Sequence, residues 1–410
     1  MALSHLDIGV GAYSYQGLPI GKMIVQLNRE NTMRKLFTLA LISMMSFALH
    51  GQTSHPILPL ESKAPDFALP GVDGKTHKLS DYASSPILAV IFTCDHCPIA
   101  QMYESRIEKL YEDYGKQGVA VVAIQGNDPQ ATTIGELDSS DLGDTLADMK
   151  IRYQYKHLHY PYLYDGENQA VTRAYGPQAT PHVFVFDRDR RLRYEGRLDN
   201  SYRIEKVTTQ DARNAIDALL VNKPIAVTHT GVFGCSTKWA EKRSLVAAYE
   251  QKLDATPVTV DLVDAAGLKK LRANAGDNYM LVSFWATWCG SCVAEFSDLQ
   301  DTFRMYSDRG FQLVTVSANM PDEKPSVLRF LERKHATSRN LIFASDDTAA
   351  LQSAFDPKWQ SAVPYTVLLG PNGIVLYSSL GSVDILELRR KLLAVMPSDY
   401  IGFNKYWQGQ

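Results

Sequence analysis

The strongest constraint on the fold is that two Cys-x-x-Cys pairs each follow a run typical of a buried strand. Residues 87–93 form a continuous apolar, β-rich run, and Cys94-Asp95-His96-Cys97 follows it at once. Residues 279–285 form a second such run, shortly before Cys289-Gly290-Ser291-Cys292. After each pair come apolar side chains at helical spacing, another strand, an X-Pro pair with strands and a last amphipathic stretch. The repeated order predicts an α/β protein built from two copies of one fold.

The cysteines indicate redox chemistry rather than a structural scaffold. The 410-residue chain has only five of them, too few for a disulfide framework. At a strand–helix junction the first cysteine of a pair lies at the helix N-terminus, where free N–H groups and the helix dipole stabilise a thiolate. We therefore predict Cys94 and Cys289 as attacking thiols and Cys97 and Cys292 as resolving thiols.

The two residues between the cysteines of the first pair are expected to tune the pKa of Cys94. A charged His96 stabilises the Cys94 thiolate, and with it the reduced form of the pair. Asp95 opposes this effect by like-charge repulsion. The second pair has only Gly290 and Ser291 between its cysteines, so we predict that the first pair is the more oxidising.

The second cysteine region is similar to a known family. Residues 284–292, Phe-Trp-Ala-Thr-Trp-Cys-Gly-Ser-Cys, resemble the thioredoxin superfamily and within it the exported TlpA/ResA-like branch. Glu295 matches an acidic residue that this branch keeps beside its active site, and the resemblance implies that Glu295 shuttles the proton of the dithiol. Ser283 departs from the pattern, because the family has Asp or Asn there.

The first region resembles the redoxin (AhpC/TSA-like) group. The resemblance rests on residues 64–67, Ala-Pro-Asp-Phe, on residues 92–98 around the cysteines, on residues 127–128 and on residues 234–239. It implies two thioredoxin-like folds in tandem, each with a central mixed β-sheet flanked by helices. The family also holds a cis-proline in the loop that faces the cysteines.

The resemblance places the two cis-prolines at Pro181, after Thr180, and at Pro364, after Val363. A proline there leaves neighbouring backbone groups free to pair with an extended substrate segment, so these loops are the predicted substrate-binding sites. The alternative is that both are ordinary trans prolines at the starts of strands.

The N-terminal region has the pattern of an export signal. Basic residues at 34–35, an apolar run over 36–49 and a small residue at 51 describe a secretory signal peptide, with an uncleaved membrane anchor as the alternative. The predicted organisation is therefore an upstream extension outside the native protein (1–32), the signal peptide (33–51), a redoxin/thioredoxin-like domain (60–222), a linker with Cys235 (223–257), a second thioredoxin-like domain (258–398) and a tail (399–410).

Two features allow more than one interpretation. Cys235 is either a buried structural residue or a third redox cysteine, because the chain after residue 222 is long enough to return to the first pair. The aromatic-rich stretch over 153–164 is either a recognition surface or a half-buried strand, and alternating aromatic residues favour the strand.

Together these observations predict an exported, periplasmic or extracytoplasmic, thiol–disulfide oxidoreductase that needs no cofactor beyond its redox-active disulfides. We expect cysteine-containing envelope proteins and a membrane or periplasmic electron donor as partners, and no membrane span after signal cleavage. The net charge of −3 and the absence of a basic arm argue against nucleic acid.

Three alternative functions remain. A thiol peroxidase would need Pro and Thr seven and three positions before Cys94, where Ile87 and Ile91 stand instead. A metal role, either zinc shared by both pairs or metal transfer by the first pair with His96, is disfavoured because the pairs are far apart and each follows its own strand. A non-catalytic envelope binding module would not need two intact dithiols.

Overall fold

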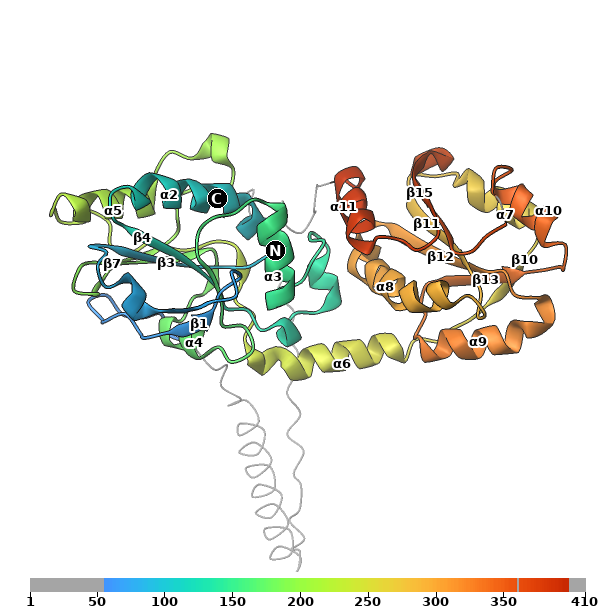
Figure 1. Ribbon diagram of the computed structural model, residues 1–410, viewed down its shortest axis with the longest axis horizontal. Helices are drawn as coiled ribbons and strands as arrows, with labels where there is room; N and C mark the ends of the chain where they lie inside the picture. Colours follow the sequence, from blue (N-terminus) through green and yellow to red (C-terminus); the bar gives the residue numbers. More distant parts are fainter. Residues whose placement is uncertain (1–54, 360, 398–410) are drawn as a thin grey trace, which may run out of the picture. The chain divides into compact units, whose positions relative to one another are not determined.

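The computed structural model describes residues 55–359 and 361–397. The predicted upstream extension, signal peptide and tail lie outside these residues. Within them the chain forms two separate large β-sheets, each flanked by helices (Figure 1). In the same part of the chain, no helix has both the length and the apolar character to cross a membrane.

The first sheet has the strand order β5-β4-β3-β7-β8. Its strands are β3 (Leu88–Thr93), β4 (Ala120–Gln125), β5 (Tyr162–Tyr164), β7 (His182–Phe186) and β8 (Leu192–Gly196). The strands β3, β4 and β5 are parallel, whereas β7 and β8 run antiparallel to their neighbours. All six residues of β3 are buried, because this central strand is covered on both faces.

Helices cover both faces of the first sheet (Figure 1). On one face Ile91 lies in a core cluster with Tyr103 and Ile216, and on the other Phe92 clusters with Tyr175. The first face is covered by α2 (Pro98–Gly115) and α5 (Asp211–Leu220). The second face is covered by α4 (Ala170–Tyr175) and β1 (Ala68–Pro70). Strand β1 pairs with β2 (Thr76–Lys78). The two layers hold the end of β3, and the cysteines after it, between them.

The aromatic-rich stretch over 153–164 is not one strand. Its first part belongs to helix α3 (Leu146–Tyr155), and only β5 at its end is extended. The helix begins at a capping box in which Thr145 Oγ1 accepts from the Asp148 N–H and the Asp148 carboxylate accepts from the Thr145 N–H. This local signal outweighs the strand preference of the alternating aromatic residues, so the predicted strand over 153–160 is wrong.

The second sheet has the order β10-β13-β12-β11-β14-β15. Its strands are β10 (Asp261–Val263), β11 (Tyr279–Trp285), β12 (Phe311–Ser317), β13 (Arg339–Phe343), β14 (Tyr365–Leu369) and β15 (Val375–Leu380). The first four are parallel, and β14 and β15 are antiparallel to their neighbours. Both sheets are thus mixed, with the strand before the cysteine pair inside the sheet, as predicted.

Alternating residues of β11 distribute the second core over both faces of the sheet. Leu281 clusters with Leu299 and Leu388, while Phe284 clusters with Leu268 and others on the opposite face. The helices are α7 (Ala265–Ala273), α8 (Gly290–Tyr306), α9 (Lys324–Arg333), α10 (Thr348–Phe355) and α11 (Ile385–Val395). This arrangement fixes α8, whose first turn carries the second cysteine pair.

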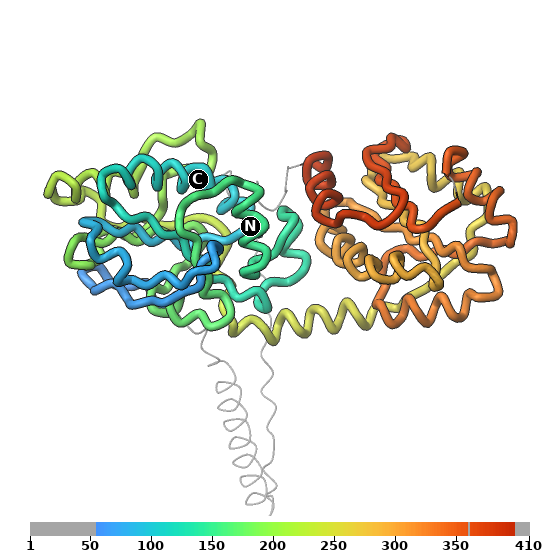
Figure 2. The backbone as a smooth tube through the Cα atoms, viewed as in Figure 1, coloured from blue at the N-terminus to red at the C-terminus, as the bar shows by residue number. Residues whose placement is uncertain are grey.

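The chain after α5 returns to the first sheet before it continues (Figure 2). The short strand β9 (Cys235–Ser236) pairs antiparallel with β6 (Ala179–Thr180), which immediately precedes Pro181. Helix α6 (Arg243–Asp254) then follows, within the predicted linker. The segment that carries Cys235 is therefore paired with the loop that faces the first cysteine pair.

Candidate active sites

The first cysteine pair lies between β3 and α2, but α2 begins only at Pro98, after both cysteines. Cys97 is therefore the N-cap residue, so the prediction that Cys94 lies at the helix N-terminus is wrong. A residue before proline is disfavoured in the helical region, and Cys97 has the extended angles φ −71° and ψ 120°. The second pair has no proline after it. There α8 begins at Gly290, and Cys289 is the N-cap residue as predicted.

The sulfur of Cys97 is surrounded by hydrogen-bond donors. The backbone N–H groups of Ala100 and Cys235 lie 3.5 Å and 3.4 Å from Cys97 Sγ. Burial opposes the charged form, but hydrogen bonds from the Cys235 and Cys94 thiols and the charge of His96 outweigh it and hold the pKa of Cys97 well below its usual range. Burial and the neighbouring Cys97 sulfur raise the pKa of Cys94. In this geometry the thiolate belongs to Cys97 rather than to Cys94.

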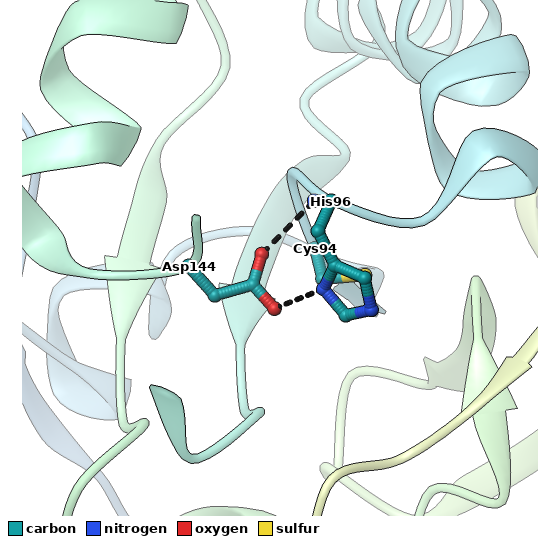
Figure 3. Close-up of side chains that lie close together, drawn as sticks. All are labelled: Cys94, His96 and Asp144. Carbon is teal, nitrogen blue, oxygen red and sulfur yellow. Dashed lines mark hydrogen bonds and ion pairs between the residues drawn. The ribbon is translucent and has the colours of Figure 1, made fainter. Parts of the chain in front are cut away.

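The Asp144 carboxylate holds the turn that contains the first pair. Its Oδ1 accepts the backbone N–H groups of Asp95 at 2.9 Å and His96 at 3.0 Å, and its Oδ2 lies 2.5 Å from His96 Nδ1 (Figure 3). Burial alone would lower the pKa of His96, but Asp144 outweighs burial and raises it. Burial would raise the pKa of Asp144, but His96 outweighs burial here too and lowers this pKa to about 2. The raised pKa favours the cationic form of His96, and its charge lowers the pKa of Cys97.

Asp95, the second residue expected to tune the first pair, is buried. Its Oδ1 accepts a hydrogen bond of 2.9 Å from the Tyr162 hydroxyl, and its buried Oδ2 has no hydrogen-bond partner. Burial raises the pKa of Asp95 well above its usual range, against the opposing charge of Arg152. A raised pKa favours the neutral form of Asp95 and so weakens the like-charge repulsion that the sequence predicts.

Asp144 is the functional residue that the sequence does not reveal. It lies 48 positions from His96, in a polar stretch with no motif of its own. Asn127 Nδ2 donates to Asp144 Oδ2 at 3.0 Å, and Asn127 Oδ1 accepts the N–H of Lys238 at 2.9 Å. Asn127 and Lys238 are part of the resemblance noted above, and this network is what joins them to the first pair.

Both X-Pro residues face a cysteine. The bonds Thr180–Pro181 and Val363–Pro364 are cis, as predicted. The Thr180 hydroxyl lies 3.1 Å from Cys94 Sγ, and the Val363 carbonyl oxygen lies 3.6 Å from Cys289 Sγ. The predicted role of these loops in substrate binding stays a prediction.

The second pair is joined as the disulfide Cys289–Cys292, and the Cys292 N–H lies 3.2 Å from Cys289 Sγ. Glu295 lies one helical turn further along α8 and is buried. Its Oε2 accepts the Val383 N–H at 2.9 Å, while its buried Oε1 has no hydrogen-bond partner. Burial raises the pKa of Glu295, which suits a group that holds and releases a proton.

One group of side chains among the described residues has the spacing of a metal site. Ligand atoms of Cys94, His96 and Asp144 all lie within 4.8 Å of one another and are buried (Figure 3). These are ligand types that zinc accepts. In the structure His96 and Asp144 already pair with each other and Cys94 with Thr180, so a metal would have to replace these contacts.

Two buried strand–helix junctions, each with a Cys-x-x-Cys pair facing a cis-proline loop, define a thiol–disulfide oxidoreductase of the thioredoxin type. The comparisons with known proteins agree. Residues 60–195 match the AhpC/TSA family, and residues 254–390 match the Redoxin family. The chain belongs to the thioredoxin superfamily, as a tandem of these two domains.

Individual relatives match parts of the chain. It is 25% identical over 165 residues to the thiol-disulfide oxidoreductase ResA of Geobacillus thermodenitrificans (strain NG80-2), over 39% of this chain and 83% of the relative. It is 24% identical over 123 residues to ResA of Bacillus subtilis (strain 168), over 30% and 64%. A solved structure of a hypothetical protein from Sinorhizobium meliloti 1021 has 36% identity and a TM-score of 0.40, over 45% of this chain and 97% of that chain.

Proposed function

We propose that the protein is exported and exchanges disulfides with cysteine-containing proteins of the cell envelope, with a membrane or periplasmic protein as electron donor. Each domain holds its own redox couple, Cys94/Cys97 in the first and Cys289/Cys292 in the second. No cofactor takes part, because the two electrons are carried by the dithiols themselves.

One observation carries this proposal: each domain brings a cysteine sulfur within 3.6 Å of the residue before its cis-proline. A disulfide substrate bound in extended form beside that loop would present its sulfur to the cysteine pair. The structural relation occurs twice in the chain, with different residues, Thr180 and Val363. Exchange chemistry explains both occurrences with one mechanism.

Reduction of insulin by the full chain, with dithiothreitol as electron source, tests the activity. We expect catalysis by the parent, partial loss in Cys94→Ser/Cys97→Ser and in Cys289→Ser/Cys292→Ser, and complete loss when both changes are combined. Each double variant serves as the control for the other. An inactive parent would support the non-catalytic binding module instead.

Consumption of hydrogen peroxide tests the peroxidase alternative. The residues at the positions of the peroxidase Pro and Thr are Ile87 and Ile91, both buried and apolar, so the hydroxyl of the peroxidase motif is missing. We therefore expect insulin reduction without catalytic peroxide turnover. We also expect activity to survive a metal chelator, whereas loss of insulin reduction on chelation would favour a metal at Cys94, His96 and Asp144.

N-terminal sequencing of the product on the outer side of the cytoplasmic membrane tests export. The basic start and apolar run predict a mature protein that begins shortly after Gly51. Retention of residues 1–32 in that product would contradict both the signal peptide and the assignment of residues 1–32 to an upstream extension. Retention of residues 33–51 alone would support the uncleaved anchor.

A further inference from the structure

The substrate position of the first domain already contains a segment of the same chain. Strand β9 pairs with β6, and Cys235 lies directly opposite Thr180, the residue before Pro181. Among the residues that the structure describes, no strand pairs with Val363, which has the same place in the second domain. The two sites therefore differ in what lies beside the cis-proline loop, and in the first domain a cysteine lies there.

Three sulfurs meet around Thr180. Its hydroxyl lies 3.1 Å from Cys94 Sγ and 3.4 Å from the Cys235 carbonyl oxygen. The Cys235 N–H donates to Cys97 Sγ at 3.4 Å, and the Cys235 thiol donates to the same sulfur, which raises the pKa of Cys235. The proton between Cys235 and Cys97 is thus already on the path that an exchange between these two sulfurs would use.

The three cysteines differ in access to solvent. Cys94 is 1% exposed and Cys97 is 0% exposed, whereas Cys235 is only partly buried. Both members of the pair are thus buried while β9 is in place, and Cys235 is the most exposed of the three residues.

The segment is fastened to the first domain rather than laid over it. Gly234 has φ +143°, and a Cβ atom there would lie 2.0 Å from the Thr180 carbonyl oxygen, so the backbones approach as closely as glycine allows. Thr237 Oγ1 donates to the Pro177 carbonyl at 2.7 Å, and the buried Lys238 forms an ion pair with Glu136 at 2.5 Å. These contacts favour a cysteine that works in place over a lid that must leave.

We propose that Cys235 is a third redox cysteine, through which disulfide exchange with other proteins reaches the buried pair Cys94/Cys97. The inference rests on the proposed function and adds the residue that meets the substrate in the first domain. It assigns to Cys97 the exchange with Cys235, and to Cys94 the closing of the final disulfide.

The steps balance for reduction of an external disulfide. Cys235 Sγ attacks one sulfur of the substrate and forms a mixed disulfide, its proton passes to the Cys97 thiolate, and the first substrate thiolate leaves. Cys97 Sγ then attacks Cys235 Sγ and forms the disulfide Cys97–Cys235. The proton of Cys97 passes to the second substrate sulfur, which leaves as a thiol. Finally Cys94 attacks Cys97 Sγ, and Cys235 leaves with the Cys94 proton. Two electrons pass from Cys94 and Cys97 to the substrate, and Cys235 ends as it began.

Mapping of a trapped adduct tests this order of events. The full chain carries Cys289→Ser/Cys292→Ser, to silence the second pair, together with Cys97→Ser, and reacts with 5,5′-dithiobis(2-nitrobenzoate). Because Cys235 is accessible and Cys94 is buried, we expect the thionitrobenzoate adduct on Cys235, formed at least about tenfold faster than on Cys94. An adduct on Cys94 would overturn the inference and leave the proposed function intact.

A second set of variants measures turnover by the first domain, again with the second pair silenced. We expect Cys235→Ser to slow insulin reduction at least about tenfold, because the buried pair loses its accessible sulfur. Ser236→Ala is the matched control and should keep the parent rate. The double change Cys235→Ser/Ser236→Cys moves the thiol to the opposite side of β9 and should not restore it. Parent-like turnover by Cys235→Ser would refute the relay. No turnover by the protein that carries Cys289→Ser/Cys292→Ser alone would refute the proposed function of the first domain itself.

Discussion

The backbone N–H of Cys235 donates a hydrogen bond to the sulfur of Cys97, 3.4 Å away and 138 positions earlier in the chain. The first active site is thus assembled from two distant segments, and its thiolate is stabilised by both. Pro98 delays the start of α2 and makes Cys97 the N-cap residue, whereas Cys289 has that place in the second site. The N-cap position therefore falls on different cysteines of the motif in the two domains.

Replacement of Gly234 should uncover the first pair. In Gly234→Ala the new Cβ would meet the Thr180 carbonyl oxygen at 2.0 Å in a backbone conformation that L-residues rarely adopt, so β9 must shift. We expect faster alkylation of Cys97 by iodoacetamide and a loss of roughly 1–3 kcal/mol in the free energy of unfolding. Gly231→Ala, where no heavy atom lies within 4 Å of the Cβ, is the control. Equal alkylation rates in the two variants would contradict the closure by β9.

Removal of the Asp144 charge should weaken the thiolate. In Asp144→Asn the cationic form of His96 loses its partner, so the pKa of His96 falls and the pKa of Cys97 rises. The thiolate absorbance near 240 nm, followed against pH, reports the second change, and histidine NMR signals report the first. Asp73→Asn removes the acidic partner of the partly buried His77 in the same domain and should leave the thiolate titration unchanged. A titration curve unaltered by Asp144→Asn would exclude His96 as its stabiliser.

The ion pair between His96 and Asp144 predicts a pH window for stability. The lowered pKa of Asp144, about 2, gives a contribution that is present above the unfolded value near 4 and is lost as the pH falls towards 2. The raised pKa of His96 gives a contribution that is present below about 6.5 and is lost as the pH rises through the folded value. The difference in melting temperature between the parent and Asp144→Asn should therefore be largest between about pH 4 and pH 6.5. A difference that grows above that range would contradict the pairing.

Glu295→Gln should slow exchange at the second pair alone. The buried Glu295 carboxyl has an oxygen without a partner and a raised pKa, and proton transfer by such a group typically contributes on the order of 10²-fold to a rate. Stopped-flow reduction of the Cys289–Cys292 disulfide by dithiothreitol measures this step. Glu332→Gln, an exposed acidic residue on α9, is the control. Equal rates for Glu295→Gln and the parent would remove the assigned role.

The features that the sequence predicts well are those encoded locally. Buried strands such as residues 279–285 read as continuous apolar runs, and the cysteine pairs follow them directly. The start of α2 is also encoded locally, because Pro98 restricts the backbone of Cys97. The expectation that Cys94 lies at the helix N-terminus treats both pairs alike and leaves Pro98 out of account. The capping box at Thr145 is a similar local signal, and in the folded chain it outweighs the strand preference of the aromatic residues.

The features that escape prediction depend on contacts between distant segments. Asp144 is one acidic residue in a polar stretch, and only the fold brings it to His96. The length of chain after residue 222 allows Cys235 to return to the first pair but does not require it, and the pairing of β9 with β6 decides the matter. The burial that raises the pKa of Asp95 is likewise a property of the folded core rather than of its neighbours in sequence.

The most direct measurement of the central claim is a redox titration of both pairs in the full chain. The protein is equilibrated in glutathione or dithiothreitol buffers of known potential and alkylated, and the peptides that carry each pair are quantified by mass spectrometry. Stabilisation of the Cys97 thiolate by His96 and Cys235 favours the reduced form, so the first pair should be the more oxidising. We predict two separate two-electron transitions, with the midpoint of Cys94/Cys97 higher by at least about 30 mV, a tenfold change in the equilibrium constant. A first pair with a midpoint equal to or below that of Cys289/Cys292 would contradict the account.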